Sequence, residues 1–231
     1  LIIGNAYISG CSLDKHWANA QENATAYEYR KIIEGKRTNV KGKTLLECIK
    51  DEPWDYISFQ QVSTNSGESD TYAPLLPLMN YVADHVVNKN VKYVLHATWA
   101  FEQTTKHWGF ERYQSDQMCM YTSIANAVKV VIEKINGSKS DIRIEFVIPS
   151  GTAIQNGRTS YIGDKFCDSD GFHLNLLGRY TAACVWLEMI TGKSAVGNGY
   201  KPSDIDEKQA KIAQISAHNA VMNPYKITPW Q

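Results

Sequence analysis

An aspartate and a histidine stand three residues apart in the segment Asp170-Gly171-Phe172-His173, near the carboxyl end of this 231-residue chain. At this spacing the aspartate can accept the Nδ1 proton of the imidazole, which leaves Nε2 free to act as a general base. The apolar run that begins at Leu174 predicts a helix. A helix N-terminus favours a neutral imidazole, because the helix dipole opposes positive charge there. The pair is therefore half of a hydrolase triad.

A nucleophile for such a base is expected where a buried strand runs into a turn. The same residue can then attack a carbonyl and donate its backbone N–H to the resulting oxyanion. Residues 1–7 are typical of a buried strand that enters a glycine turn, and Ala6 stands at the nucleophile position without a nucleophilic atom. Ser9 and Ser12 lie beyond the turn, so neither combines a strand-end position with its own N–H in the oxyanion site.

Further oxyanion donors are expected from two other segments. Gly42 precedes a predicted helix, and its backbone can approach a substrate closely because glycine has no Cβ. An amide at the end of the strand 56–59 supplies another donor, and Gln61 and Asn65 are the candidates, with Gln60 behind them. The alternative is that Gly42 is only a turn glycine and that the glutamines only form a polar strand end.

Composition excludes several classes of function. The 24 basic and 24 acidic residues cancel without a run of like charge, which argues against nucleic acid or an anionic membrane as a partner. The five cysteines are scattered and lack C-x-x-C spacing, so neither a disulfide scaffold nor a zinc ribbon is expected. The histidines show no metal-binding spacing, and we expect no cofactor and no catalytic metal. No apolar stretch is long enough to span a bilayer. Any signal segment would precede residue 1, which already lies in the first expected strand.

Strand-like and helix-like segments alternate along the chain. The expected strands are 1–3, 56–59, 91–96 and 142–148, and the expected helices are 12–20, 44–50, 76–88, 116–135 and 174–190, the last of these being the last core helix. A hairpin is expected around residues 26–37 as a decoration on the core. Strands separated by helices predict a parallel sheet with helices on both faces, which binds ligands at the carboxyl ends of its strands. We expect one domain over residues 1–231.

Four segments together resemble the sequence blocks of the SGNH (GDSL-type) hydrolases, in the family's order. They are Gly4-Asn5-Ala6, Gly42-Lys43-Thr44-Leu45, the strand 54–61 and Asp170-x-x-His173. The resemblance implies a flavodoxin-like three-layer α/β/α sandwich with a mostly parallel sheet, to which the small β-hairpin is an insertion. It also implies ester hydrolysis through a serine acyl-enzyme, and it favours a secreted or periplasmic location.

The chain departs from this family at two places. Ala6 stands where the family has its nucleophilic serine, and the Gly-x-Asn of the third block has no counterpart among residues 60–65. A serine replaced by alanine, by engineering or in nature, would keep the backbone donor and trap substrate. The rival interpretation is a natural pseudoenzyme that has kept a binding cleft.

The aromatic residues favour a carbohydrate ester over a lipid ester as the substrate. Thirteen tyrosines and six tryptophans are many for this length. Several lie near expected strand ends, where flat rings could stack on sugars: Tyr7, Trp17, Tyr72, Trp99, Phe101 and Trp108. Among these Tyr7 and Trp99, together with Gln60, are the predicted substrate-binding residues. The alternative is that these rings only pack in the core.

Three classes of function follow. The first is a serine-type O-acetyl esterase of carbohydrates, inactivated at position 6 and acting on a small-molecule or oligosaccharide ester, with a lipid-ester hydrolase as a variant. The second is a non-catalytic carbohydrate-binding protein on the same fold. The third, a flavodoxin-like binder of a nucleotide or flavin, is weakest, because residues 4–10 lack both G-x-G-x-x-G and a P-loop lysine.

Overall fold

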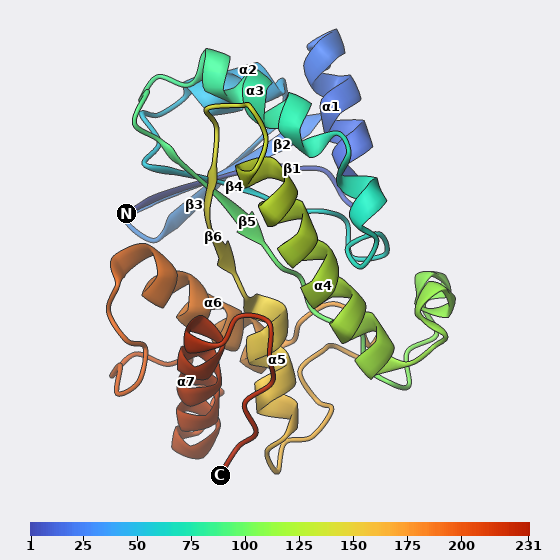
Figure 1. The fold of residues 1–231 in the computed structure, drawn as a ribbon. Coiled ribbons are helices and arrows are strands. Elements are labelled where there is room, and N and C mark those ends of the chain that lie inside the picture. Colours follow the sequence, from blue (N-terminus) through green and yellow to red (C-terminus); the bar gives the residue numbers. More distant parts are fainter.

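The computed structural model describes all 231 residues, and its strands form two separate sheets (Figure 1). The first sheet is antiparallel, in the order β1 (Ile2–Tyr7), β2 (Tyr27–Ile33) and β3 (Lys36–Lys43). The second sheet is parallel, in the order β4 (Tyr56–Phe59), β5 (Lys92–His96) and β6 (Ile144–Ile148). The protein is therefore a mixed α/β structure.

Helices pack on both faces of the parallel sheet. They are α1 (Leu13–Glu22), α2 (Leu45–Lys50), α3 (Leu75–His85), α4 (Gln117–Asn136), α5 (Ser150–Arg158), α6 (Leu176–Thr191) and α7 (Glu207–Met222). Two 3-10 turns, Ser69–Tyr72 and Trp108–Tyr113, lie in the loops. Figure 1 shows α5, α6 and α7 grouped at one end of the molecule and α1, α2 and α3 at the other.

The hydrophobic core is divided between the two faces of the parallel sheet. Side chains alternate along a strand, so neighbouring residues of β5 serve different faces. Leu95 packs in the cluster that includes α3 and α4, whereas Val94 packs in the cluster that includes α5, α6 and α7. Both side chains are completely buried. The strands of this sheet are thus covered on both faces, as the alternation of elements predicts.

The ends of the predicted helices are set by local capping. The side chain of Ser12 accepts the Lys15 N–H at the start of α1, and Thr44 forms a capping box with Glu47 at the start of α2. At the end of α6, Gly192 adopts a left-handed conformation with φ of 68°. These signals are local, which explains why the sequence places the helices to within a few residues.

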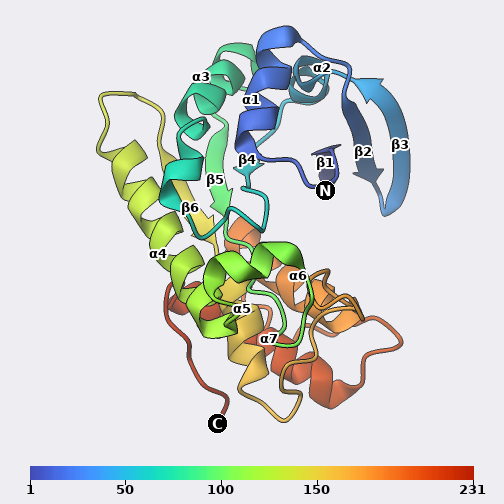
Figure 2. The same cartoon turned by 90° about the vertical axis from the view of Figure 1, so that its right-hand side faces the viewer.

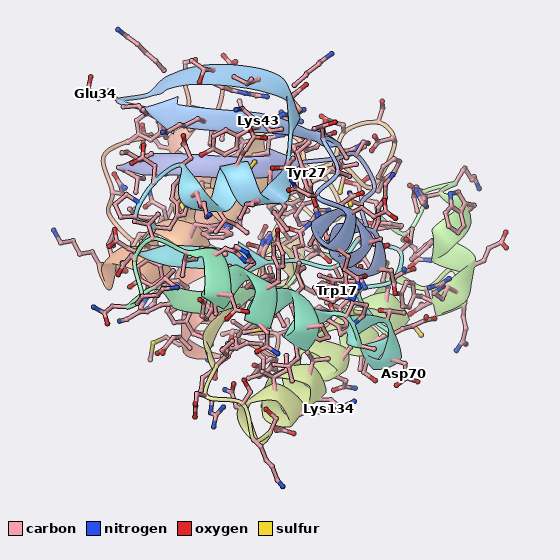
Figure 3. The ribbon with its side chains drawn as sticks, turned by 90° about the horizontal axis from the view of Figure 1, so that it is seen from above. Trp17, Tyr27, Glu34, Lys43, Asp70 and Lys134 are labelled. Carbon is pink, nitrogen blue, oxygen red and sulfur yellow. The ribbon has the colours of Figure 1, made fainter.

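The first strand differs from its prediction. β1 was expected to be buried in the parallel sheet, but it pairs antiparallel with β2, from Ile2 opposite Ile33 to Tyr7 opposite Glu28. Its residues 2–5 are exposed. The hairpin of β2 and β3, seen from above in Figure 3 with Glu34 at its turn, therefore belongs to a sheet of its own. Pairing with the hairpin satisfies the backbone of β1 on one side and moves the strand away from the core.

Two helices are missing from the prediction. In α5 every residue is buried, including polar side chains such as Gln155 and Asn156, so it has no apolar stripe to reveal a helix. In α7 the buried face is made mostly of alanines that give a weak periodic signal: Ala210, Ala213, Ala217 and Ala220. The helix α6 is consequently not the last core helix, because α7 packs against both α5 and α6.

Candidate functional site

The turn before α6 brings Asp170 and His173 into direct contact. Asp170 Oδ2 lies 2.7 Å from His173 Nδ1, which is the expected geometry of the pair. The other carboxylate oxygen accepts the backbone N–H groups of Phe172 and His173, at 2.9 and 3.0 Å. The side chain of His173 is 68% exposed, and its Nε2 has no hydrogen-bond partner in the protein. The hydrogen bond at Nδ1 therefore holds the His173 ring in place, and Nε2 is left as a proton acceptor at the surface.

Hydrogen bonds determine the charge of Asp170. Partial burial acts to raise the pKa of this carboxyl, but the N–H groups of Phe172 and His173 and the imidazole itself outweigh it, and the pKa lies below the usual value. Asp170 is therefore ionised at neutral pH and accepts only. An ionised carboxylate on Nδ1 favours the tautomer that leaves Nε2 as the acceptor.

A distant loop positions this turn. Gly171 has φ of 75°, and a Cβ on it would lie 2.8 Å from the Cβ of Thr105, so both the backbone and the space require glycine. The Thr105 hydroxyl donates to the Asp170 carbonyl at 2.8 Å, and the Glu102 N–H donates to the Gly171 carbonyl at 2.8 Å. Residues 102–105 follow β5 at its carboxyl end, which is how the sheet fixes the turn.

Aromatic side chains from the same loop surround Phe172. The indole N–H of Trp99 donates to the Phe172 carbonyl at 2.8 Å, so this predicted substrate-binding residue lies beside the Asp170–His173 turn. The ring of Phe172 meets that of His107 edge to face at 4.6 Å between centroids. His107 in turn stacks on Trp108. Trp108 is 70% exposed to solvent. The site thus has an aromatic rim.

A pocket of about 350 Å³ lies between the loop and the turn. It is lined by Glu102, Thr104, Thr105, Lys106, His107, Ser169, Asp170, Gly171 and Phe172. Burial raises the pKa of Glu102, with a smaller opposing effect from the Cys167 N–H that it accepts. Burial also lowers the pKa of His107, and nearby His173 adds to this effect while Asp170 opposes it. Both shifts favour the neutral forms of these two groups, whereas Asp170 in the same lining is ionised.

Ala6 lies near the carboxyl end of β1, before the turn rather than in it. It lies inside β1, opposite Tyr29, and the strand continues to Tyr7. The turn comes later, at Gly10, which has φ of 59°. Tyr7, a predicted substrate-binding residue, has the Arg30 guanidinium 3.3 Å from its ring centroid. The guanidinium of Arg30, on β2 of the antiparallel sheet, therefore covers the ring of Tyr7.

Of the predicted oxyanion donors, Gln61 serves the fold instead, whereas the backbone at Gly42 remains accessible. Gly42 lies in β3 with φ of 75°, at an irregularity in the pairing with β2, and its Cβ position faces open space. Gln61 is completely buried. Its amide oxygen accepts the Leu13 and Val62 N–H groups at 3.1 and 2.8 Å, and its amide nitrogen donates to Thr71. With both ends engaged, Gln61 has no donor for a substrate.

Asn65 and Gln60 keep a free amide nitrogen. The Asn65 oxygen accepts from Arg112 at 2.8 Å, and no hydrogen bond uses its nitrogen. The Gln60 oxygen lies 2.6 Å from His96 Nδ1, and its nitrogen has no partner in the protein. Of the predicted amides, these two alone retain the capacity to donate to a ligand.

A second polar cluster joins the carboxyl ends of the three parallel strands. His96 at the end of β5 is bonded through Nδ1 to Gln60 after β4, and through Nε2 to the Ser150 hydroxyl after β6, at 2.9 Å. Burial lowers the pKa of His96 to about 4, so the ring is neutral at physiological pH. Ser150 is completely buried. This serine and histidine are adjacent, yet no substrate can reach the hydroxyl, and the cluster ties the strand ends together.

Sequence reasoning named Trp108 but missed the contacts of the loop 102–108 with the turn, because the partners lie more than 60 residues apart in sequence. The signal was its composition, a polar run between the aromatic residues Phe101 and Trp108 soon after a buried strand. Such loops carry ligand-binding residues in α/β proteins.

The fold and the site define an α/β protein with an Asp–His turn and an aromatic-rimmed pocket beside its parallel sheet. Residues 1–220 match the family DUF4886, described as a domain of unknown function, and the chain belongs to this family. A crystal structure of a DUF4886 family protein from Bacteroides uniformis ATCC 8492 is similar, with 45% identity and a TM-score of 0.92. The match covers 98% of this chain and 85% of that chain. A search of curated proteins gives no match.

None of the helices combines the length and the apolar character that crossing a bilayer requires.

Proposed function

We propose that this site is that of a serine-type ester hydrolase which removes O-acetyl groups from a carbohydrate. The observation that carries the proposal is the contact of 2.7 Å between Asp170 and His173, which fixes an exposed imidazole with a free Nε2. The adjoining pocket is small and polar and has an aromatic rim at Trp108, a combination that suits a sugar ring with an acyl group. A lipid ester would instead require a broad aliphatic surface.

The chemistry assigned to the pair is general-base catalysis. His173 Nε2 would take the proton of the attacking hydroxyl, and Asp170 would stabilise the imidazolium that forms. The SGNH resemblance assigns the nucleophile to position 6, where the methyl group of Ala6 cannot attack. The protein as it stands would therefore bind its ester and hydrolyse it barely above background. Asn65 and Gln60 are the remaining amide candidates for the oxyanion.

The proposed architecture is the flavodoxin-like three-layer α/β/α sandwich, in which the hairpin of β2 and β3 is an insertion. The support for it is the parallel order of β4, β5 and β6 and the division of the core between the two faces of that sheet. The site lies beyond the carboxyl ends of these strands, where such folds bind ligands.

The experiment is acetate release from a panel of acetylated polysaccharides by the Ala6→Ser protein. We expect turnover in Ala6→Ser, none above background in the unchanged protein, and loss of turnover when His173→Gln is added. Ala26→Ser, the same change at an exposed site before β2, is the matched control and should stay inactive. Full activity of the unchanged protein would show that position 6 is not the nucleophile and that His173 activates water directly.

A second candidate function is carbohydrate binding without catalysis. It is favoured by the position of Gln61, which leaves the oxyanion site without one of its expected donors. Retained glycan binding in an Ala6→Ser protein that hydrolyses none of the esters would support this candidate over the esterase.

A further inference from the structure

Two imidazole rings share one phenyl ring at the edge of the pocket. The ring centroid of Phe172 lies 4.6 Å from that of His107 and 4.3 Å from that of His173. His107 belongs to the loop after β5, and His173 belongs to the turn before α6. Figure 2 shows this loop, in green, beside the orange segment that contains the turn. The two histidines are therefore within reach of one small ligand.

The tautomer of His107 follows from its hydrogen bond. The backbone N–H of Gly109 donates to His107 Nδ1 at 3.0 Å, and this contact caps the 3-10 turn Trp108–Tyr113. A ring nitrogen that accepts a hydrogen bond carries no proton, so in the neutral ring the proton lies on Nε2. His107 lines the pocket, and its Nε2 has no hydrogen-bond partner in the protein.

Close packing keeps His107 in this neutral state. Gly109 is buried, and a Cβ on it would lie 2.4 Å from Thr64 Cγ2 and 3.3 Å from His107 Nδ1. The absence of a side chain therefore lets this N–H approach the ring. A proton on Nδ1 would face the Gly109 N–H and break the contact. Burial also lowers the pKa of His107; Asp170 opposes this shift and His173 adds to it.

The two histidines consequently have opposite hydrogen-bonding roles. His173 uses its Nδ1 proton in the contact with Asp170 and leaves Nε2 as an acceptor. His107 accepts at Nδ1 and leaves Nε2 as a donor. Ester hydrolysis needs both roles, because one group must take the proton of the attacking hydroxyl and another must donate to the carbonyl oxygen. A neutral imidazole is able to act as such a donor.

We propose that His107 binds the ligand through a hydrogen bond from its Nε2–H to the carbonyl oxygen of the acyl group. The nature of the ligand rests on the ester function proposed above. A carbonyl oxygen only accepts hydrogen bonds, which matches a ring nitrogen that only donates. Another donor of the pocket, the Thr105 hydroxyl, is already engaged by the Asp170 carbonyl.

Two substitutions separate the donor from the cap. In His107→Asn the side-chain oxygen can replace Nδ1 as the acceptor of the Gly109 N–H, but no atom reaches the position of Nε2. In His107→Gln the amide nitrogen can reach that position, but the cap is lost. His107→Asn should therefore keep the Tm and lose the donor. His107→Gln should lower the Tm by a few degrees and keep the donor.

The test is ligand binding by the unchanged protein and by these two variants of it, measured by isothermal titration calorimetry. The probes are oligosaccharides from the panel of acetylated polysaccharides, and the same oligosaccharides after alkaline deacetylation. We expect His107→Asn to bind the acetylated probe about fivefold more weakly, and His107→Gln to bind it within about twofold of the unchanged protein. Neither substitution should alter binding of the deacetylated probe.

Several results would overturn the proposal. An unchanged affinity in His107→Asn, or equal losses in the two variants, would show that Nε2 donates nothing to the ligand. An equal loss with the deacetylated probe would show that the acceptor is not the acyl carbonyl. Absence of binding by the unchanged protein would remove the ligand altogether.

The tautomer gives an independent measurement. The nitrogen chemical shifts of the His107 ring, measured by NMR at neutral pH, should show the proton on Nε2, and the Nε2 signal should shift when the acetylated probe is added. A proton on Nδ1 would overturn the proposal. Neither measurement involves turnover. Failure of the Ala6→Ser protein to hydrolyse esters would therefore count against the esterase alone, and the result at His107 would stand.

Discussion

The two histidine clusters at the carboxyl end of the parallel sheet differ in what surrounds the imidazole. His173 is bonded to the carboxylate of Asp170 and exposes its other nitrogen, whereas His96 is bonded through both nitrogens to neutral groups and is buried. A buried imidazole with neutral partners is held uncharged and cannot exchange protons with a ligand. An exposed imidazole with an ionised partner can do so. The comparison teaches that proximity of serine and histidine, as in Ser150 and His96, does not by itself make a catalytic site.

The largest effect is expected at the exposed cluster. In the Ala6→Ser protein, His173→Gln should lower acetate release about a thousandfold, because no other group can take the hydroxyl proton. Its thermal stability should be almost unchanged, since the side chain is 68% exposed. The measurements are initial rates on acetylated polysaccharide and Tm. A large loss of Tm would mean that His173 stabilises the fold, as His96 does.

The next effect distinguishes two adjacent glutamines. Gln61→Ala should lower the free energy of unfolding by about 3 kcal/mol, because it leaves the Leu13 N–H and the Thr71 carbonyl buried without partners. Gln60→Ala, the matched control, removes an exposed side chain and one hydrogen bond, to His96, and should cost less. Urea unfolding measures both. A Gln61 variant as stable as the Gln60 variant would return Gln61 to the list of available oxyanion donors.

The pH dependence of stability sharpens the contrast for His96. The pKa of His96 is about 4 in the folded protein, below the usual 6.5, so between these values the unfolded chain binds the extra proton. Stability should be complete above pH 6.5 and fall as the pH falls towards 4, with this residue contributing roughly 2 kcal/mol. His16, with a pKa also lowered to about 4 by burial, adds to the slope. Urea unfolding between pH 7 and 4.5 should show a shallower slope in His96→Gln, and identical slopes would disprove the burial effect.

The smallest effect concerns the aromatic rim. Trp108→Ala should weaken glycan binding about fivefold, a loss that corresponds to one stacked aromatic contact of about 1 kcal/mol. Tyr200→Ala removes an equally exposed ring at 71% and serves as the control. Isothermal titration calorimetry with an acetylated oligosaccharide measures the two affinities. Equal affinities would remove Trp108 from the site.

Local interactions explain how much of the protein the sequence predicts. Asp170 and His173 are three residues apart, so their contact depends on a short turn that glycine at 171 permits. Ser12 and Thr44 lie directly before the helices that they cap, and Gly192 lies directly after its helix. In each case the physical cause lies within a few residues of its effect, and the sequence by itself determined these features.

Tertiary structure decided the rest. The segment around Ala6 has the composition of a parallel core strand, but pairing with the hairpin placed β1 in an antiparallel sheet. Gln61 is a polar residue at a strand end, and only the approach of Leu13 and Thr71 engaged its amide and made it structural. Thr105 and Asp170 meet across 65 residues because the sheet brings the loop after β5 to the turn before α6. Partners distant in the chain are chosen by packing and by backbone pairing, and residue types alone do not encode that choice.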